Sequence, residues 1–377
     1  MKRAESNRRP GWLSRCEELG FCYHTTEEGL YWDESACYAF TSEEIDTLDD
    51  ATAELYGLCL SAIDRVVSDD LFGRLGIPFA FADLAKRSWQ RKDPSLYGRF
   101  DLCYNGNGNP KLLEFNADTP TSLYESSIVQ WVWLQDLHPT MDQFNSIHEK
   151  LVDAFSSMKR TLFSFPTFHF SCMKDNAEDF VTTEYLRDVA TQQGFATRRI
   201  FIEEIGWSED VHKFADLEGQ PIDMLFKLYP WEWLIAEEFG KNLPGETMRI
   251  VEPAWKMILS NKGILPILWE MYPDHPNLLP AYFEPDTITS YVKKPLLSRE
   301  GANITISDEH GTESSSGAYG DEGFLYQQYC PLPDFAGNHA VIGSWVIDGK
   351  SAGIGVREDS TRITTNTSRF VPHYFKP

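Results

Sequence analysis

The chain has 377 residues, of which 42% are hydrophobic and 14% are aromatic. This is enough apolar material to bury a full core, so intrinsic disorder is excluded, and at roughly 150 residues per domain the length suggests two or three packed units. The 34 basic and 57 acidic residues leave a net charge of −23, which argues against nucleic acid as a partner. The same charge attracts metal ions or amines, although acidity of this kind is also common among soluble proteins.

Cysteine use and the lack of long apolar segments bear on the compartment. Seven cysteines occur, and no C-x-x-C pair is present, so we expect neither a disulfide framework nor a zinc site. The basic stretch 1–10 leads into no apolar segment, and nowhere do about 18 uncharged apolar residues run together. These features favour a protein of the reducing cytoplasm that makes no contact with a membrane.

The first predicted element is a long helix. Apolar residues from Ile45 to Val66 keep mostly to one helical face, and Thr41 or Ser42 precedes them as a capping residue. This pattern predicts an amphipathic helix. We interpret its acidic outer face as a solvated surface rather than as a metal site.

A hairpin and a second helix follow. The N-G-N-G-N-P turn at 105–110 joins two strand-like runs, 98–104 and 111–116, which predicts a β-hairpin. A helix is expected at 122–135, directly after the polar cluster 118–121, whose residue types favour helix caps. The predicted order is therefore strand, polar turn and helix N-terminus.

The stretch 168–205 alternates between strand, helix and strand, with Gly194 before the second strand. This alternation is typical of a parallel βαβ arrangement, and we interpret it as a Rossmann-like unit. No G-x-G-x-x-G follows its first strand, so a dinucleotide site is not expected.

The last third begins with a predicted helix at 256–271 and then becomes largely β. Strands are expected at 290–294, 323–329, 340–347 and 353–357. Between them, the polar, glycine-rich segment 307–322 predicts a flexible hairpin tip or lid. Asp348 and Gly349 favour a two-residue hairpin turn.

A candidate cation site lies on the predicted hairpin. Side chains two apart on a strand point the same way, so Glu114 and Asn116 present oxygen atoms on one face, with Asp101 on the partner strand. Mg²⁺ prefers oxygen ligands and normally takes one or two carboxylates together with phosphates and water. On its own, the pattern is more typical of an outward polar strand face.

A lysine-bearing strand end supports the site. Lys293-Lys294-Pro295 precedes the loop 298–303 (S-R-E-G-A-N), whose small residues can approach phosphates. The Walker spacing and the kinase H-R-D motif are absent, which excludes a P-loop enzyme and a protein kinase. The absence of G-x-S-x-G weakens an α/β-hydrolase interpretation.

Residues 113–122 (L-E-F-N-A-D-T-P-T-S) resemble the signature of the glutathionylspermidine synthetase-like ATP-grasp ligases. Further blocks that resemble family motifs occur at 227–232, 252–256, 260–262, 292–295, 298–303, 355–359 and 369–373. The resemblance runs from about residue 9 to the C-terminus. It is strongest to the stand-alone bacterial members, which are described as acid–amine ligases and lack the amidase domain of the bifunctional enzymes.

The resemblance implies an α/β (α+β) chain with an ATP-grasp fold in circularly permuted order and a Rossmann-like pre-ATP-grasp unit. The magnesium-binding strand precedes the nucleotide-binding lysines, as in permuted relatives such as eukaryotic glutathione synthetase. Three stretches are expected: 1–140 with helices and the magnesium-binding hairpin, 141–255 with the Rossmann-like unit, and 256–377 with the ATP-binding lysines, a lid loop and the C-terminal core strands.

The resemblance also implies roles for individual residues. The implied ligands of two Mg²⁺ ions are Asp101, Glu114 and Asn116. The implied ATP contacts are Arg99, Lys262, Lys294, Gly301, Gln327, Gln328 and Tyr329, the last three beside adenine. Arg99 and Arg357 are expected to be catalytic, at the transferred phosphate and at the reacting carboxylate. The sequence leaves open whether Lys293 or Lys294 contacts ATP.

The substrate side is less specific. Thr119, Thr121 and Ser122 at a helix N-terminus suit a carboxylate or acyl-phosphate oxygen, and simple helix capping explains them equally well. They depart from the Ser/Cys-rich version of glutathione-using relatives, which puts glutathione in doubt as the acid. Glu232, between two tryptophans, could bind an ammonium group, although an aromatic core strand is the simpler explanation.

The expected function is an ATP- and Mg²⁺-dependent ligase that joins a small acid or peptide to an amine. Phosphoryl transfer to a carboxylate gathers negative charge that Mg²⁺, lysines and arginines neutralise, and an amine then attacks the acyl phosphate. One alternative is a non-enzymatic nucleotide-binding module, and another is an ATPase or small-molecule kinase on the same fold. The motifs do not encode the acid, the amine or the oligomeric state.

Overall fold

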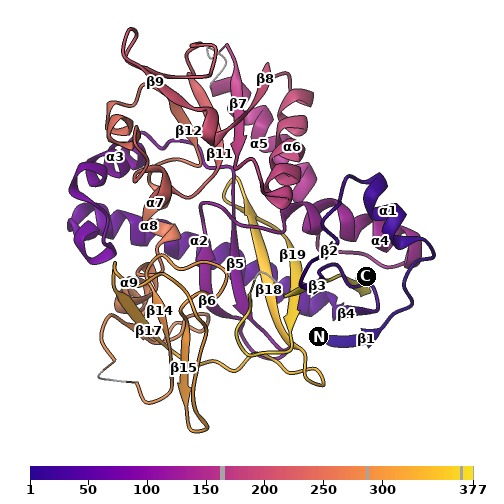
Figure 1. Cartoon of the computed structure of the whole chain (residues 1–377). Coiled ribbons are helices and arrows are strands. Elements are labelled where there is room, and N and C mark those ends of the chain that lie inside the picture. Colours follow the sequence, from indigo (N-terminus) through magenta and orange to yellow (C-terminus); the bar gives the residue numbers. More distant parts are fainter. Residues whose placement is uncertain (162–165, 286–287, 366–367, 377) are drawn as a thin grey trace.

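The computed structural model describes residues 1–161, 166–285, 288–365 and 368–376 (Figure 1). Three sheets organise the chain. An antiparallel sheet lies in the middle of the view in Figure 1, with a parallel sheet above it and a second antiparallel sheet below it. The helices pack around these sheets.

The central sheet joins two distant parts of the chain. Its strand order is β20 (Arg369–Val371), β19 (Lys350–Asp359), β18 (His339–Ile347), β5 (Tyr97–Cys103) and β6 (Lys111–Asn116). The predicted hairpin is confirmed as β5 and β6, and the predicted turn is confirmed between β18 and β19, where Asp348 and Gly349 have φ values of 47° and 75°. Because β18 pairs with β5, residues from both halves of the chain share one surface.

The predicted long helix is confirmed as α2 (Ser42–Ser68). Thr41 accepts a hydrogen bond from the backbone of Glu44, and the Glu44 side chain accepts one from the backbone of Thr41, which makes a capping box. The apolar face of α2 is buried beside the central sheet. The acidic residues of its outer face are exposed, namely Asp46, Asp49, Asp50, Glu54 and Asp64. The expected solvated face is therefore present.

The parallel sheet has the strand order β12 (Arg249–Val251), β11 (Met224–Leu228), β7 (Phe168–Cys172) and β8 (Thr197–Phe201). The helices α6 (Ala177–Gln192) and α5 (Ile147–Thr161) lie beside it (Figure 1). The predicted strand–helix–strand order is confirmed, since β7 and β8 pair in parallel on either side of α6 in the sequence. The second strand ends at Phe201, short of the predicted 205, because a 3-10 turn, η3 (Ile202–Glu204), follows.

The third sheet has the order β13 (Ala281–Tyr282), β17 (Phe324–Gln328), β14 (Tyr291–Pro295), β15 (Thr305–Asp308) and β16 (Gly311–Ser314). The strands expected at 290–294 and 323–329 are confirmed as β14 and β17, which pair antiparallel. The segment 307–322 includes the end of β15, the turn and all of β16, so a hairpin tip is present there.

A small sheet joins the two ends of the chain. β4 (Ala36–Thr41) pairs antiparallel with β1 (Lys2–Glu5) and parallel with β21 (His373–Lys376), and both termini lie on this side of the molecule (Figure 1). The remaining elements are α1 (Trp12–Glu18), β2 (Thr25–Thr26), β3 (Gly29–Leu30), η1 (Leu71–Leu75), α3 (Phe79–Gln90), β9 (Gly206–Ser208), β10 (Lys213–Ala215), α7 (Trp231–Leu234) and η4 (Gly240–Gly245). Across the described ranges, every helix is too short or too polar to cross a lipid bilayer.

Two helix predictions need correction. The helix expected at 256–271 is two helices, α8 (Lys256–Ser260) and α9 (Ile264–Met271). Asn261 breaks it because its backbone is extended, its side chain accepts from the Gly263 amide, and its amide group donates to the Leu75 carbonyl. The helix expected at 122–135 begins at 123 and contains a wider turn, η2 (Glu125–Val129), before α4 (Gln130–Leu137).

Candidate active site

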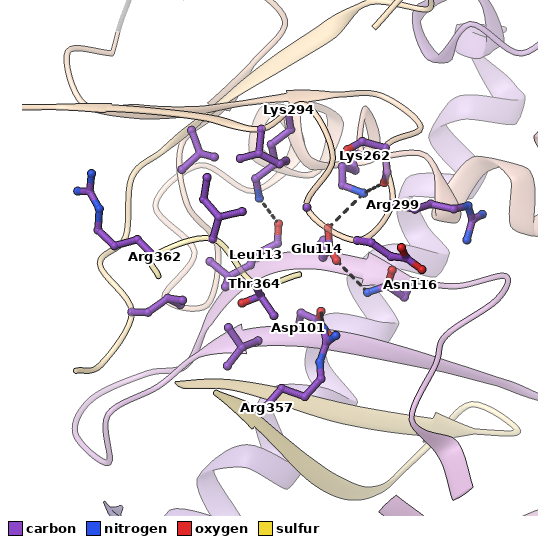
Figure 2. A pocket seen from close by; sticks show the side chains of 18 of the residues that line it. Asp101, Leu113, Glu114, Asn116, Lys262, Lys294, Arg299, Arg357, Arg362 and Thr364 are labelled. Carbon is purple, nitrogen blue, oxygen red and sulfur yellow. Dashed lines mark hydrogen bonds and ion pairs between the residues drawn. The ribbon is translucent and has the colours of Figure 1, made fainter. Parts of the chain in front are cut away.

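A cleft that is partly open to solvent lies between the central sheet and the third sheet. Figure 2 shows charged side chains of both sheets pointing into it. The predicted site residues that line it are Arg99, Asp101, Glu114, Asn116, Thr119, Thr121, Lys262, Lys294, Gly301, Tyr329 and Arg357. The fold therefore brings together residues that are up to about 260 positions apart in the sequence.

Asp101 lies between two arginines on the central sheet. Arg99 Nε and Nη2 donate to its two carboxylate oxygens at 2.7 and 3.1 Å, and Arg357 Nη2 donates to Oδ2 at 3.2 Å. Gly343 on the neighbouring strand leaves room for this arrangement, because a Cβ there would lie 2.7 Å from Arg99 Cδ. The two arginines and Asp101 thus form one charged group on the floor of the cleft.

Glu114 lies between an amide and a lysine. Asn116 Nδ2 donates to Glu114 Oε1 at 3.0 Å, and Lys262 Nζ lies 3.2 Å from Oε2 (Figure 2). Burial opposes ionisation of this carboxyl, but the charges of Lys262 and Lys294 outweigh it and hold the pKa of Glu114 well below its usual range. Glu114 is therefore ionised at neutral pH.

Lys294 points into the cleft from β14. Its Nζ donates to the Leu113 carbonyl at 2.8 Å and to Gln327 Oε1 at 2.7 Å, and burial lowers its pKa to about 8. Lys293 points the other way, since its Nζ lies 3.9 Å from the ring centroid of Phe324. Of the two lysines that the sequence could not tell apart, Lys294 is the one that lines the cleft.

Lys262 reaches the cleft from the break between α8 and α9. Its backbone amide donates to the Leu296 carbonyl at 2.8 Å, and its Nζ donates to the Ser298 carbonyl at 2.5 Å. A continuous helix would not make these two contacts to the segment after β14. The break between α8 and α9, where the sequence predicted one continuous helix, therefore places Lys262 at the cleft.

Arg299, in the loop after β14, was not among the predicted site residues. Its Nε and Nη2 donate to Glu232 Oε1 at 3.0 and 2.8 Å, and its Nη1 donates to Thr119 Oγ1. Glu232 therefore pairs with a cation of the chain itself and does not line the cleft, and the expected aromatic core strand is instead the short helix α7. Arg299 is the lone cation of the 298–303 block, which is the signal that could have identified it.

Three predicted contacts lie beside the cleft rather than in it. Gln327 is buried behind Lys294 and also donates to the Leu112 carbonyl at 2.9 Å. Gln328 is exposed, and its backbone amide donates to the Pro280 carbonyl at 2.7 Å. Ser122 is buried, and its hydroxyl lies 3.0 Å from the Tyr31 hydroxyl.

A group of carboxyls lies behind Ser122, and no sequence pattern indicates it. Glu125 is buried, whereas Glu178 and Asp179 are half-buried. The Ser122 amide donates to Glu178 Oε1 at 3.1 Å, and the Tyr31 hydroxyl donates to Glu125 Oε1 at 2.6 Å. Burial, together with the charge of Glu178, raises the pKa of Glu125 to about 8 and that of Asp179 to about 7. Burial also raises the pKa of Glu178. The protonated, neutral form of these carboxyls is therefore favoured beside the cleft.

Two lysines of the blocks that resemble family motifs, Lys227 and Lys256, make buried contacts that stabilise the fold. Lys227 Nζ donates to Asp118 Oδ1 at 2.7 Å, and both side chains are 0% exposed. Lys256 lies 3.4 Å from Glu252 and donates to the carbonyls of Tyr97 and Ala117 at 3.0 and 2.9 Å. These contacts fix the ends of β5 and β6, the strands that carry Asp101 and Glu114.

The oxygen donors fit a hard cation. Asp101 and Glu114 are opposite each other in the β5–β6 register, and Asn116 adds a carboxamide oxygen next to Glu114. In the described ranges, His, Cys, Asp and Glu side chains form no group of three or more that could hold a metal ion. A cation bound here would thus depend on this mixed set and on ligands that do not come from the chain.

Comparison with known proteins identifies the family. The family model described as glutathionylspermidine synthase preATP-grasp matches residues 3–376. The chain belongs to this family. This match confirms the family that the sequence predicted. It also confirms that the chain belongs to a class of enzymes, the synthetases and ligases.

Members of the glutathionylspermidine synthase family differ in length. The chain is 43% identical to a Haemophilus influenzae protein named "Putative acid--amine ligase", over 98% of both chains. It is 28% identical to trypanothione synthetase of Crithidia fasciculata, over 95% of this chain but 57% of that protein. Among solved structures, a glutathione synthetase-like effector of Globodera pallida shares the fold, with a TM-score of 0.58 and 9% identity over 98% of both chains. The mixed α/β class is therefore confirmed.

Proposed function

We propose that this chain is an ATP- and Mg²⁺-dependent ligase that forms an amide bond between a carboxylic acid and an amine through an acyl phosphate. The observation that carries the proposal is that Lys294 of the third sheet and Lys262 of the α8–α9 break meet an oxygen set and two arginines of the central sheet in one cleft. The oxygen set is Asp101, Glu114 and Asn116, and the arginines are Arg99 and Arg357. The names of its relatives, an acid–amine ligase and a synthetase, support it.

The proposal includes an ATP-grasp fold in permuted order. The magnesium-binding hairpin lies in 1–140, the lysines lie in 256–377, and the parallel sheet of 141–255 is the Rossmann-like unit that precedes them. In support, the central sheet draws its strands from the first and last of these stretches, and the parallel sheet lies wholly within the middle one.

The nucleotide is proposed to lie against the third sheet. Lys262 and Lys294 bind its phosphates, and the loop at Gly301 covers them. Apolar side chains of Val292, Ile306 and Leu332 line the same cleft and suit a purine ring. Tyr329 borders the ring, whereas Gln327 acts by orienting Lys294.

Asp101, Glu114 and Asn116 are proposed to hold two Mg²⁺ ions together with the phosphates. When bound, these ions neutralise the charge that develops on the transferred phosphoryl group. The two carboxylates pair with Arg99, Arg357 and Lys262. If these carboxylates held metal ions, the three cations would be available to the phosphates and the acid.

Arg99 and Arg357 are proposed to act on the acid. A carboxylate oxygen of the acid attacks the γ-phosphorus, and the bond to the leaving ADP oxygen breaks. The guanidinium groups hold the carboxylate and the phosphoryl oxygens in the planar two-point geometry that arginine provides. Thr119 and Thr121 line the same end of the cleft and offer hydroxyl groups to the acyl phosphate.

The amine is proposed to enter from the side of the carboxyls behind Ser122. Glu125 Oε2 has no hydrogen-bond partner, and Glu178 also borders a second cavity with Tyr23 and Tyr31. An ammonium group bound beside these carboxyls would favour their ionised form. The carboxylate so formed can accept the ammonium proton before the amine nitrogen attacks the acyl carbon. The amide then forms and inorganic phosphate leaves.

The test is ATP turnover by the purified protein with Mg²⁺ and a panel of acids and amines. ADP release that requires both an acid and an amine, and a hydroxamate that forms when hydroxylamine replaces the amine, would support the ligase. A phosphorylated alcohol would indicate a kinase, ADP release without an acid would indicate an ATPase, and nucleotide binding without turnover would indicate a non-enzymatic module. Any of these three results would contradict the proposal.

Matched lysine variants test the nucleotide site directly. Lys294→Met should raise the Kd for ATP about 10- to 100-fold, because a hydrogen bond to a charged group contributes about 1.5–3 kcal/mol. Lys293→Met removes the adjacent lysine of the same strand, which packs on Phe324, and should leave the Kd within about twofold. Equal effects of the two substitutions would contradict the assignment.

A further inference from the structure

Cys330 lines the cleft, and Cys103 lies next to it, although 227 positions separate the two in the sequence. Cys103 is the last residue of β5 in the central sheet, and Cys330 follows β17 of the third sheet. Their sulfur atoms are 3.4 Å apart, and Cys103 Sγ also donates to the Pro331 carbonyl at 3.3 Å. All seven cysteines are in the described ranges, and none forms a disulfide.

We propose that Cys103 and Cys330 form a reversible disulfide site, which couples the redox state of the chain to occupancy of the cleft. A disulfide bond is about 2.0 Å long, so the two sulfurs need to approach by about 1.4 Å. The bond would tie β5 to the segment after β17. It would therefore link the two sheets between which the cleft lies.

Exposure defines which sulfur reacts first. Cys330 is partly exposed and lines the cleft, whereas Cys103 is buried at 8% exposure. The hydrogen bond with Cys103, followed by the positive charges of Lys111 and Lys294, lowers the pKa of Cys330 and so favours its thiolate. Cys330 is thus the attacking sulfur, and Cys103 is the resolving one.

The oxidant is a peroxide, and the step balances. The Cys330 thiolate attacks one oxygen of hydrogen peroxide, the O–O bond breaks, and hydroxide leaves, which gives a sulfenic acid. The Cys103 sulfur then attacks the Cys330 sulfur, the S–O bond breaks, and water leaves. In total two thiols lose two electrons and two protons, and one hydrogen peroxide becomes two molecules of water.

The link to cleft occupancy rests on the proposed function. Cys330 shares the cleft with Lys294 and Tyr329, the residues assigned to the nucleotide. A bound nucleotide would cover Cys330 and hinder the peroxide. At a nucleotide concentration about ten times its Kd, the fraction of open cleft falls about tenfold, and the oxidation rate should fall in proportion.

The experiment counts thiols in the full-length reduced protein after treatment with hydrogen peroxide. The number of thiols titrated in denaturant should fall from seven to five, a digest should contain the Cys103–Cys330 cross-linked peptide, and dithiothreitol should restore all seven. In Cys103→Ser, the Cys330 sulfenic acid persists and should be trapped by dimedone. In Cys22→Ser, which removes an exposed cysteine far from the pair in sequence, two thiols should still be lost. Retention of all seven thiols, or cross-links between other cysteines, would overturn the proposal.

A nonhydrolysable ATP analogue with Mg²⁺ tests the disulfide site and its coupling to cleft occupancy separately. If calorimetry shows that the analogue binds and the oxidation rate does not change, the coupling to the cleft is refuted. If the analogue does not bind, the proposed nucleotide site fails, and the thiol count still decides whether the disulfide site exists.

Discussion

The buried ion pair of Lys227 and Asp118 gives the sharpest test of how the motif residues stabilise this fold. Both side chains are 0% exposed, and their charged atoms are 2.7 Å apart. Lys227→Met keeps the length and apolar stem of the side chain but leaves Asp118 with the Trp231 backbone amide as its remaining donor. Removal of one partner of a buried pair costs about 3–5 kcal/mol, because the other charge stays buried and uncompensated.

The expected shift in melting temperature follows from the length of the chain. At about 2.1 cal/mol/K per residue, unfolding of 377 residues has an entropy of about 0.8 kcal/mol/K, so Lys227→Met should lower Tm by about 4–6 °C. The double variant Lys227→Met with Asp118→Asn should recover part of this loss, since the uncompensated charge is gone. Thermal unfolding followed by circular dichroism measures both.

The chain contains a matched control. Lys213 and Asp223 are 2.8 Å apart, but their side chains are 40% and 27% exposed, so water screens the pair. Lys213→Met should cost no more than about 1 kcal/mol, which is about 1 °C in Tm. If the two Lys→Met substitutions had equal effects on Tm, or if the double variant were less stable than Lys227→Met, burial of the charge would not be the cause and the reasoning would be refuted.

Three further predictions concern the cleft. Gly343→Ala should lower the ligase rate about 10²-fold in the ADP-release assay, because the new Cβ would lie 2.7 Å from Arg99 Cδ. Gly57→Ala is the control, since Gly57 has open space around it, and this variant should leave the rate unchanged. The pKa of Glu125 is raised on folding to about 8, so its contribution to the free energy of unfolding is complete below about pH 4 and is lost as the pH rises through about 8. Urea titrations from about pH 5 to about pH 9 should therefore show a fall in stability that is smaller in Glu125→Gln, and an equal fall in both proteins would contradict the raised pKa. Asn261→Ala should lower the free energy of unfolding in urea by about 1–3 kcal/mol and should weaken ATP binding, because it frees the segment that holds Lys262. Unchanged ATP binding would show that other contacts hold this segment.

The elements that the sequence predicted well are those fixed by local interactions. The capping box of α2 needs only Thr41 and Glu44, three residues apart, and the Asp348–Gly349 turn needs two residues that tolerate positive φ. The helix break at Asn261 was missed because its decisive contact, to the Leu75 carbonyl, comes from 186 positions away. Local propensity favours a continuous helix there, and tertiary contact overrides it.

Site residues could be predicted from the sequence only where a recognisable motif contained them. Asp101, Glu114 and Asn116 could be placed on one face because strand geometry fixes the direction of side chains, but their proximity to Lys262 and Lys294 came from resemblance and not from spacing. The contact between Glu232 and Arg299 could not be predicted from local pattern, because the two residues are 67 positions apart. The proximity of Cys103 and Cys330 could not be predicted either, because the two residues are far apart in the sequence.

The charge of the whole chain is a poor guide to the charge inside the cleft. The net charge of −23 predicts repulsion of any polyphosphate, yet the cleft is lined by Arg99, Lys262, Lys294, Arg299, Arg357 and Arg362, against the carboxyls of Asp101, Glu114 and Glu300. At about 0.15 M salt the Debye length is about 8 Å, so acidic residues on distant surfaces such as the outer face of α2 are screened from an anion in the cleft. The cations that face it directly are partly buried and screened much less. Local geometry, rather than net charge, therefore decides which anion this chain can bind.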